Sequence, residues 1–213
     1  IDIQLLMTEA KLSYRKITEQ IAGKLDLLEA YLFYCLALCS DCYTLVSHTK
    51  IENLTSFYGI KKEEQISRWL RKFEDKELIK KQNNLIKGQY GTFSRYEYEL
   101  NTEHYVLIKN TLYDEPISRE LKGFLVLLKC KCLNGTNTCM YSQNQLAQEL
   151  GLAKSTVSRH INKAEELGYI KRNKKGIHLL NKDMFLITNE TEIAILKNAV
   201  SYTHLRAHET KAN

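Results

Sequence analysis

The chain has 213 residues and a formal net charge of +6, and its 44% hydrophobic and 26% charged residues exclude wholesale disorder. Its longest apolar run, residues 30–39, is about half of the roughly 20 residues that a membrane-spanning helix needs, so we expect no membrane partner. One proline and nine glycines favour a largely helical chain.

The first part of the chain predicts an N-terminal arm followed by a folded unit. The arm covers residues 1–25, and we expect a helix in it at 13–22. The unit covers residues 26–113 and opens with an apolar helix at 27–39. It should end near Pro116, because proline cannot continue a helix.

Later in this unit the sequence predicts a further helix and a β-hairpin. The helix, at 62–76, has an inner face at helical spacing, formed by Ile66, Trp69, Leu70 and Phe73. The hairpin should have short strands at 78–81 and 96–100, joined by a long tip at 82–94.

A second unit, at 114–187, predicts the same order of elements. Its first helix is marked by apolar residues at helical spacing: Leu121, Phe124, Leu125 and Leu128. Ser142 and Gln145 have the spacing of a capping box for a helix at 143–150, which Gly151 ends. The third helix should bury Val157, Ile161, Ala164 and Leu167, and a hairpin with strands at 169–172 and 177–180 follows it.

An internal repeat relates the two units at an offset of 91 residues. Six of the sixteen positions in 66–81 and 157–172 are identical: Ser67/Ser158, Arg68/Arg159, Lys72/Lys163, Glu74/Glu165, Ile79/Ile170 and Lys80/Lys171. We therefore interpret the chain as two copies of one unit of about 80 residues.

The last residues form a separate group. Residues 188–199 predict the start of a further helix, and residues 200–210 resemble the conceptual translation of a sequencing adapter. We therefore expect 200–213 to be an artefact in place of the natural C-terminus, and the start at Ile1 to be a truncation.

The second unit resembles a known family. Leu146-Ala147, Leu150-Gly151-Leu152 and Thr156-Val157 resemble the helix-turn-helix of bacterial winged-helix DNA-binding proteins, and the hairpin from Tyr169 resembles the wing. The resemblance covers residues 115–187 well and 26–112 more loosely. It implies a mainly α fold with small β-hairpins (α+β), arranged as two tandem winged-helix domains.

In this family the second helix of the motif enters the major groove and the wing meets the backbone, so the resemblance implies double-stranded DNA as the partner. Carried onto this chain, it implies groove-facing Lys154, Ser155, Thr156, Ser158, Arg159 and Lys163, and wing contacts from Arg172, Lys174 and Lys175. Arg159 is the best base reader, because a guanidinium can bond bidentately to guanine. The alternative is that this face is merely charged and solvated.

Basic residues gather on the helix-hairpin segments. Residues 154–182 hold eight basic and two acidic residues, and residues 61–87 hold nine basic and five acidic ones. These segments carry +10 together, whereas the chain without 200–213 carries only +5, so the remainder is acidic. A polyanionic partner favours this segregation.

The first unit departs from the family pattern. Glu63 and Glu64 at the start of its third helix would repel phosphate. Arg68, Arg71 and Lys72 could still reach a DNA backbone, as could the basic hairpin tip around Lys87 and Arg95. The alternative is a unit that serves as a partner or homodimer interface.

No pattern predicts catalysis, a cofactor or a metal site. Cys39 and Cys42 have a Cys-x-x-Cys spacing, but no second pair completes a zinc site. We expect the six cysteines to be structural thiols in a reducing cytoplasm.

We therefore expect a cytoplasmic, non-enzymatic, sequence-specific DNA-binding protein of bacterial or mobile-element origin. Its role would be replication initiation of the plasmid or phage type, or transcriptional regulation. A homodimer through the first unit or the terminal helices would be compatible with either role. The alternative is a winged-helix interaction scaffold, of the chromosome-segregation accessory type, with little direct DNA binding.

Overall fold

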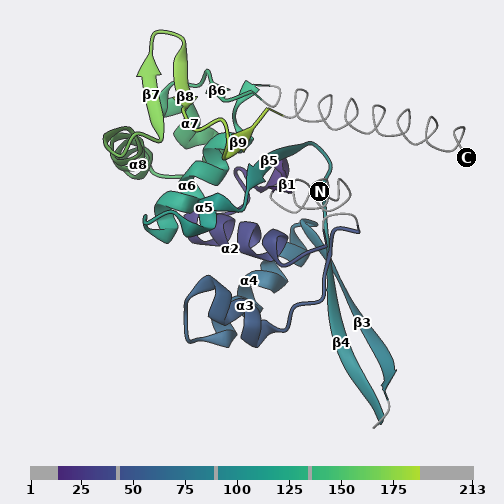
Figure 1. Cartoon of the computed structure of the whole chain (residues 1–213). Coiled ribbons are helices and arrows are strands. Elements are labelled where there is room, and N and C mark those ends of the chain that lie inside the picture. Colours follow the sequence, from purple (N-terminus) through teal and green to yellow (C-terminus); the bar gives the residue numbers. More distant parts are fainter. Residues whose placement is uncertain (1–13, 42–43, 89–90, 134–135, 188–213) are drawn as a thin grey trace, which may run out of the picture.

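The computed structural model describes residues 14–41, 44–88, 91–133 and 136–187 (Figure 1). The helix expected at 188–199, the artefact expected at 200–213 and Cys42 lie outside these described residues. Across the described residues, the fold is mixed: helices alternate with three small antiparallel sheets.

The first half of the molecule lies below α2 in Figure 1. Its sheet has the strand order β2-β4-β3. A capping box begins α2, because the Asp26 and Glu29 side chains each accept a hydrogen bond from the other's backbone N–H at 2.9 Å. The elements are α2 (Leu27–Leu38), β2 (Val46–Ser47), α3 (Ile51–Tyr58), α4 (Glu63–Asp75), β3 (Ile79–Gly88) and β4 (Gly91–Leu100).

The second half has the same order of elements and the equivalent sheet order, β6-β8-β7. The Ser142–Gln145 capping box is present, and Gly151 ends α7 in the left-handed region with φ of 63°, so both predictions are confirmed. The elements are α6 (Arg119–Cys130), β6 (Thr138–Cys139), α7 (Gln143–Leu150), α8 (Lys154–Glu166), β7 (Ile170–Asn173) and β8 (Gly176–Leu179).

A third sheet combines three strands that are far apart in the chain. One precedes α2, one lies between the two hairpin-containing halves, and one follows β8. The strand order is β1-β5-β9, with β1 at Tyr14–Thr18, β5 at Tyr105–Lys109 and β9 at Phe185–Leu186. The helix expected at 13–22 is therefore wrong: a strand and a short 3-10 helix, η1 (Glu19–Ile21), occupy that segment. Because β1 pairs with residues about 90 positions later, its local sequence could not reveal the strand.

One hydrophobic core joins the halves. It runs from Ile17 to Phe185 without a break between them, and α2 packs against α6 more extensively than any other pair of helices. The two backbones meet at Gly123, where an added Cβ would lie 1.7 Å from the Leu27 carbonyl oxygen. The short helix α5 (Thr111–Asp114) connects the halves, and Tyr113 stacks on Phe57 at 4.2 Å between ring centroids.

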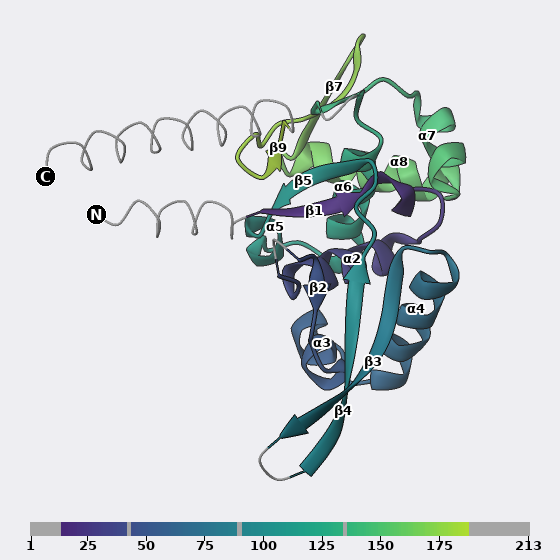
Figure 2. The same cartoon turned by 90° about the vertical axis from the view of Figure 1, so that its right-hand side faces the viewer.

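The first hairpin is longer than its sequence predicted. Strand pairing continues from Ile79↔Leu100 to Gly88↔Gly91, so the prediction of a long loop at 82–94 is wrong. Both views show β3 and β4 leaving the body as a two-stranded arm, at the opposite end of the molecule from β7 and β8 (Figure 2). Each strand of the second hairpin has only four residues.

One inner-face prediction needs correction, and a second, for Trp69, is met in part because Trp69 packs against the core. Leu167, expected to be buried, is 44% exposed, because α8 ends at Glu166 and Leu167 is its C-cap. Trp69 is only partly buried and packs edge-on against Tyr58. Among the described residues, no helix combines the length and the apolar character needed to cross a membrane.

Candidate nucleic-acid interface

The packing of α8 decides which of its side chains face outward. Val157, Ile161 and Ala164 are fully buried, and His160 stacks on Phe124 with 5.5 Å between ring centroids. Helical geometry then turns the opposite face to solvent. The exposed side chains on this outer face of α8 are Ser155, Arg159, Asn162, Lys163 and Glu166.

The predicted groove-facing residues divide into two groups. Lys154, Ser155, Arg159 and Lys163 are exposed, whereas Thr156 and Ser158 are partly buried at the edges of the outer face. A groove between α8 and the start of α6 is lined by several outer-face residues, Ser155, Arg159, Asn162 and Lys163 among them. The structure therefore brings the best predicted base reader, Arg159, together with three other predicted residues, Ser155, Ser158 and Lys163.

Asn162 is the residue that the sequence analysis missed. It lies three residues after Arg159 and shares its exposed face. Asparagine pairs bidentately with adenine in the major groove, as arginine does with guanine. Counting three residues on from Arg159 along the predicted helix would have found it.

The start of α8 suits an anion. Its first turn contains no acidic residue, and its N-cap, Ala153, has no side-chain oxygen to cap the helix. The N-terminal N–H groups and the positive end of the helix dipole are therefore not neutralised by the protein's own carboxylates. Beside α8, the N-terminus of α7 and the wing enclose a hollow lined by Ser142, Gln145, Lys174 and Lys175.

The wing residues are not equivalent. Lys174 and Lys175 are exposed at the turn between β7 and β8. Arg172, in contrast, is held by Glu165 on α8: its Nε donates to a carboxylate oxygen at 2.8 Å and its backbone N–H to the other at 2.9 Å. The hydrogen bonds from Arg172 lower the pKa of Glu165. This pair ties the wing to α8 and occupies the Arg172 guanidinium.

In the first half, α4 presents the equivalent face with a different charge pattern. At the offset of 91 residues, Glu64, Arg68, Arg71 and Asp75 correspond to Ser155, Arg159, Asn162 and Glu166, and all four are exposed. A carboxylate therefore stands at each end of this face. Glu63 and Glu64 also stabilise the start of α4 through its dipole, which leaves less attraction for an external phosphate.

Two of the predicted cations of the first half have partners within the protein. Lys72 binds the carboxylate of Glu29, with 2.6 Å between Nζ and Oε1, and the Glu29 side chain is only 4% exposed. This ion pair holds α4 against the start of α2. Arg68 donates to Gln65 on its own helix. Arg71 and Lys87 are exposed.

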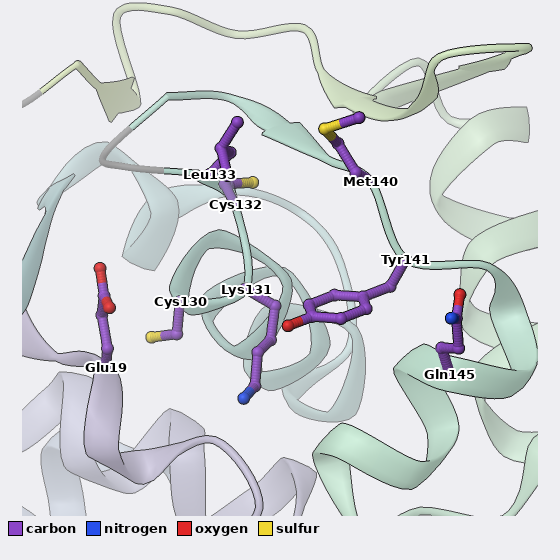
Figure 3. Close-up of a pocket in the computed structure, with 8 residues that line it drawn as sticks. All are labelled: Glu19, Cys130, Lys131, Cys132, Leu133, Met140, Tyr141 and Gln145. Atoms are coloured by element: carbon purple, nitrogen blue, oxygen red, sulfur yellow. The ribbon is translucent and has the colours of Figure 1, made fainter.

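A second hollow, of about 530 Å³, lies between η1, the end of α6 and the segment before α7 (Figure 3). Its lining includes Cys130 and Cys132, and burial raises the pKa of both thiols, that of Cys132 to about 12. These thiols stay protonated at neutral pH and are poor nucleophiles or ligands. In the described part of the chain, no group of three His, Cys, Asp or Glu side chains could hold a metal ion.

Comparison with known proteins addresses the helix-turn-helix directly. Residues 141–171 match the model of the family described as winged helix-turn-helix DNA-binding, a range that covers α7, α8 and the start of β7. No curated protein matches the chain. Residues 141–171 therefore form a winged helix-turn-helix DNA-binding domain.

Proposed function

We propose that this protein binds duplex DNA sequence-specifically, with α8 in the major groove and the β7–β8 hairpin on the adjacent backbone. The outer face of α8 carries the proposal. It combines Arg159 and Asn162, whose side chains are suited to two different bases, and Glu166 at its far end is its only carboxylate. At the N-terminus of α8, the first turn contains no acidic residue, so its N–H groups can bind a phosphate.

The residues that contact DNA in this proposal have distinct roles. Arg159 bonds to guanine and Asn162 to adenine, since each offers the donor and acceptor pattern that the base edge requires. Ser155 contacts a phosphate at the start of the helix. Lys174 and Lys175 neutralise the backbone beside the wing and fix the register without reading sequence.

The first half completes a tandem pair of winged-helix units in this proposal. The shared element order, the equivalent sheet order and the repeat at 91 residues support it. Because carboxylates flank the cations of α4, we assign base reading to α8 and a backbone or assembly role to the first half. Such unequal copies favour replication initiation in a bacterial or mobile-element system, with transcriptional regulation as the other role.

Matched substitutions on α8 and α4 test whether α8 alone reads bases. The full chain first selects its target from a pool of random duplexes, and fluorescence anisotropy then measures affinity at one fixed salt concentration. Arg159→Ala and Asn162→Ala should each weaken binding by about 1–3 kcal/mol, or about 5- to 150-fold, because each removes a bidentate base contact. Arg68→Ala, at the position equivalent to Arg159, should cost less than about threefold.

Two results would contradict the proposal. Equal losses for Arg68→Ala and Arg159→Ala would show that both halves read bases. Absence of any binding at low salt, where phosphate contacts are strongest, would leave the winged helices as a protein-interaction scaffold.

A further inference from the structure

The β3–β4 arm has two chemically different faces. Directly paired residues of antiparallel strands share a face, and residues two apart along a strand do too. One face carries Lys81, Leu85 and Lys87 of β3 and Tyr96 of β4, and we term it the free arm face. The opposite arm face carries Lys80, Arg95, Glu97 and Glu99, and the Ile86–Phe93 pair has the same register parity. The two faces therefore differ mainly in their charges.

The free arm face begins as the core-facing side of the hairpin. At its base Ile79, Tyr98 and Leu100 are buried. Farther out the arm leaves the body (Figure 2), and Leu85 on the same side is 75% exposed while Tyr96 is 44% exposed. Large apolar side chains thus continue along this side after the core that would cover them has ended.

The charges of the two faces differ. On the opposite arm face, cations and carboxylates balance: Arg95 binds Glu97 at 3.0 Å, and Lys80 pairs in register with Glu99. The free arm face has two lysines and no carboxylate, since residues 79–96 contain no Asp or Glu. Lys81 lies over the Tyr96 ring, 4.1 Å from its centroid, which holds an ammonium group against this face.

From these observations we infer that the free arm face of β3–β4 binds duplex DNA that flanks the site read by α8, without sequence preference. This inference rests on the proposed function. Lysines supply phosphate contacts, and an exposed Leu beside a Tyr supplies the apolar contact that groove-binding ribbons make with sugars and bases.

The dimensions of the arm agree with this partner. Lys81 and Lys87 are six residues apart on one strand, or about 20 Å. That distance corresponds to about six base-pair steps along the axis of a duplex. In contrast, Lys174 and Lys175 are adjacent at the turn of the β7–β8 hairpin, so they can reach a single point on the DNA backbone.

A second copy of this chain fits the arm less well. The edge strand β3 contains Lys80, Lys81 and Lys87. Lysines on an edge strand disfavour pairing with a strand of another copy. Two copies that met through the free arm face would also bring like charges together.

Two double substitutions separate the faces while removing the same charge. Lys81→Gln with Lys87→Gln alters the free arm face, and Lys80→Gln with Arg95→Gln is the matched control on the opposite face. Binding of the full chain to a 40-base-pair random duplex is measured from 50 to 200 mM salt. The first pair should reduce the slope of log affinity against log salt by about two and weaken binding about ten- to sixtyfold near 100 mM salt, while the control should change affinity less than threefold.

Two further variants test the apolar contact and the arm as a whole. Leu85→Ser should weaken binding severalfold without changing the salt slope, because it removes no charge. Replacing residues 84–95 by Asn-Gly should shorten the arm through a two-residue turn between Asn83 and Tyr96. Because this variant lacks Leu85 and Lys87, it should bind the random duplex several-fold more weakly than the parent, with a shallower salt dependence. Buried Ile79, Tyr98 and Leu100 remain in it, so its melting temperature should match that of the parent.

The outcomes distinguish this inference from the proposed function. Equal losses in the two double variants, or unchanged DNA affinity in the shortened-arm variant, would overturn the inference alone. A dimer in light scattering that becomes a monomer only when the arm is shortened, with DNA affinity unchanged, would assign the arm to a second copy. If the parent chain bound no duplex, the proposed function would fall and the inference with it. If Arg159→Ala left sequence preference intact while the arm variants lost affinity, only the role of α8 would fall.

Discussion

Gly123→Ala should destabilise the whole molecule, because the two halves share one core at this position. The added Cβ would lie 1.7 Å from the Leu27 carbonyl oxygen and 2.7 Å from the carbonyl carbon. Ordinary van der Waals contact begins near 3.4 Å. Both clashing groups belong to helix backbones, so no side chain can rotate away, and α2 and α6 must separate by roughly 1.5 Å.

The size of the effect follows from two opposing contributions. Overpacking usually costs 1–3 kcal/mol, and we expect about 4 kcal/mol here because the separation loosens contacts along the main helix interface. Alanine is favoured over glycine in a helix by about 1 kcal/mol, which offsets part of that cost. The net loss should be about 3 kcal/mol.

Urea unfolding followed by two probes tests this reasoning. The only tryptophan, Trp69, lies in the first half, whereas Gly123 lies in the second, and circular dichroism reports on both halves. Both signals should shift together to lower urea. Gly168→Ala is the control: its Cβ meets nothing within 4 Å, so only the positive φ of 78° costs stability, about 1 kcal/mol. An unchanged Trp69 transition in Gly123→Ala would refute the shared core.

Three further predictions concern charged side chains. Burial lowers the pKa of Lys129 to about 8, so between pH 8 and 10.5 the unfolded chain binds more protons than the folded chain, and the stability contributed by this group rises with pH. In urea unfolding, Lys129→Met should therefore cost up to about 3 kcal/mol more at pH 10 than at pH 7. An equal cost at the two pH values would contradict this prediction. Lys72→Gln should cost about 2 kcal/mol by leaving buried Glu29 without its cation, with DNA affinity unchanged. Glu165→Gln should release Arg172 and steepen the salt dependence of DNA binding by about one unit of slope; an unchanged slope would exclude Arg172 from the interface.

The local elements of the second half were predictable because few neighbouring residues specify them. The capping box of α7 needs only Ser142 and Gln145, and the following turn needs only Gly151. The inner face of α8 follows from helical spacing, apart from Leu167 beyond its end. The first hairpin was predicted less well, since its polar outer strands lack the burial that marks most strands.

The sequence predicted where the candidate site lies, but not which of its cations are free to bind DNA. Residue types and spacing placed Arg159 and Lys163 on an outward face. They could not show that Lys72 and Arg172 are held by Glu29 and Glu165, because the partner of a long charged side chain depends on how elements pack. Pattern reasoning therefore overestimated the number of cations free for DNA.

The sequence by itself determined the repeated order of helices and hairpins and the helix-turn-helix around Gly151, because capping, turns and helical faces involve residues close in the chain. Only the tertiary structure decided that the two halves share one hydrophobic core. The contact of Gly123 with Leu27 joins residues about 100 positions apart, and the third sheet joins strands from both ends and the middle of the described chain. Such contacts depend on which buried surfaces meet when both halves fold, and no local pattern records that choice.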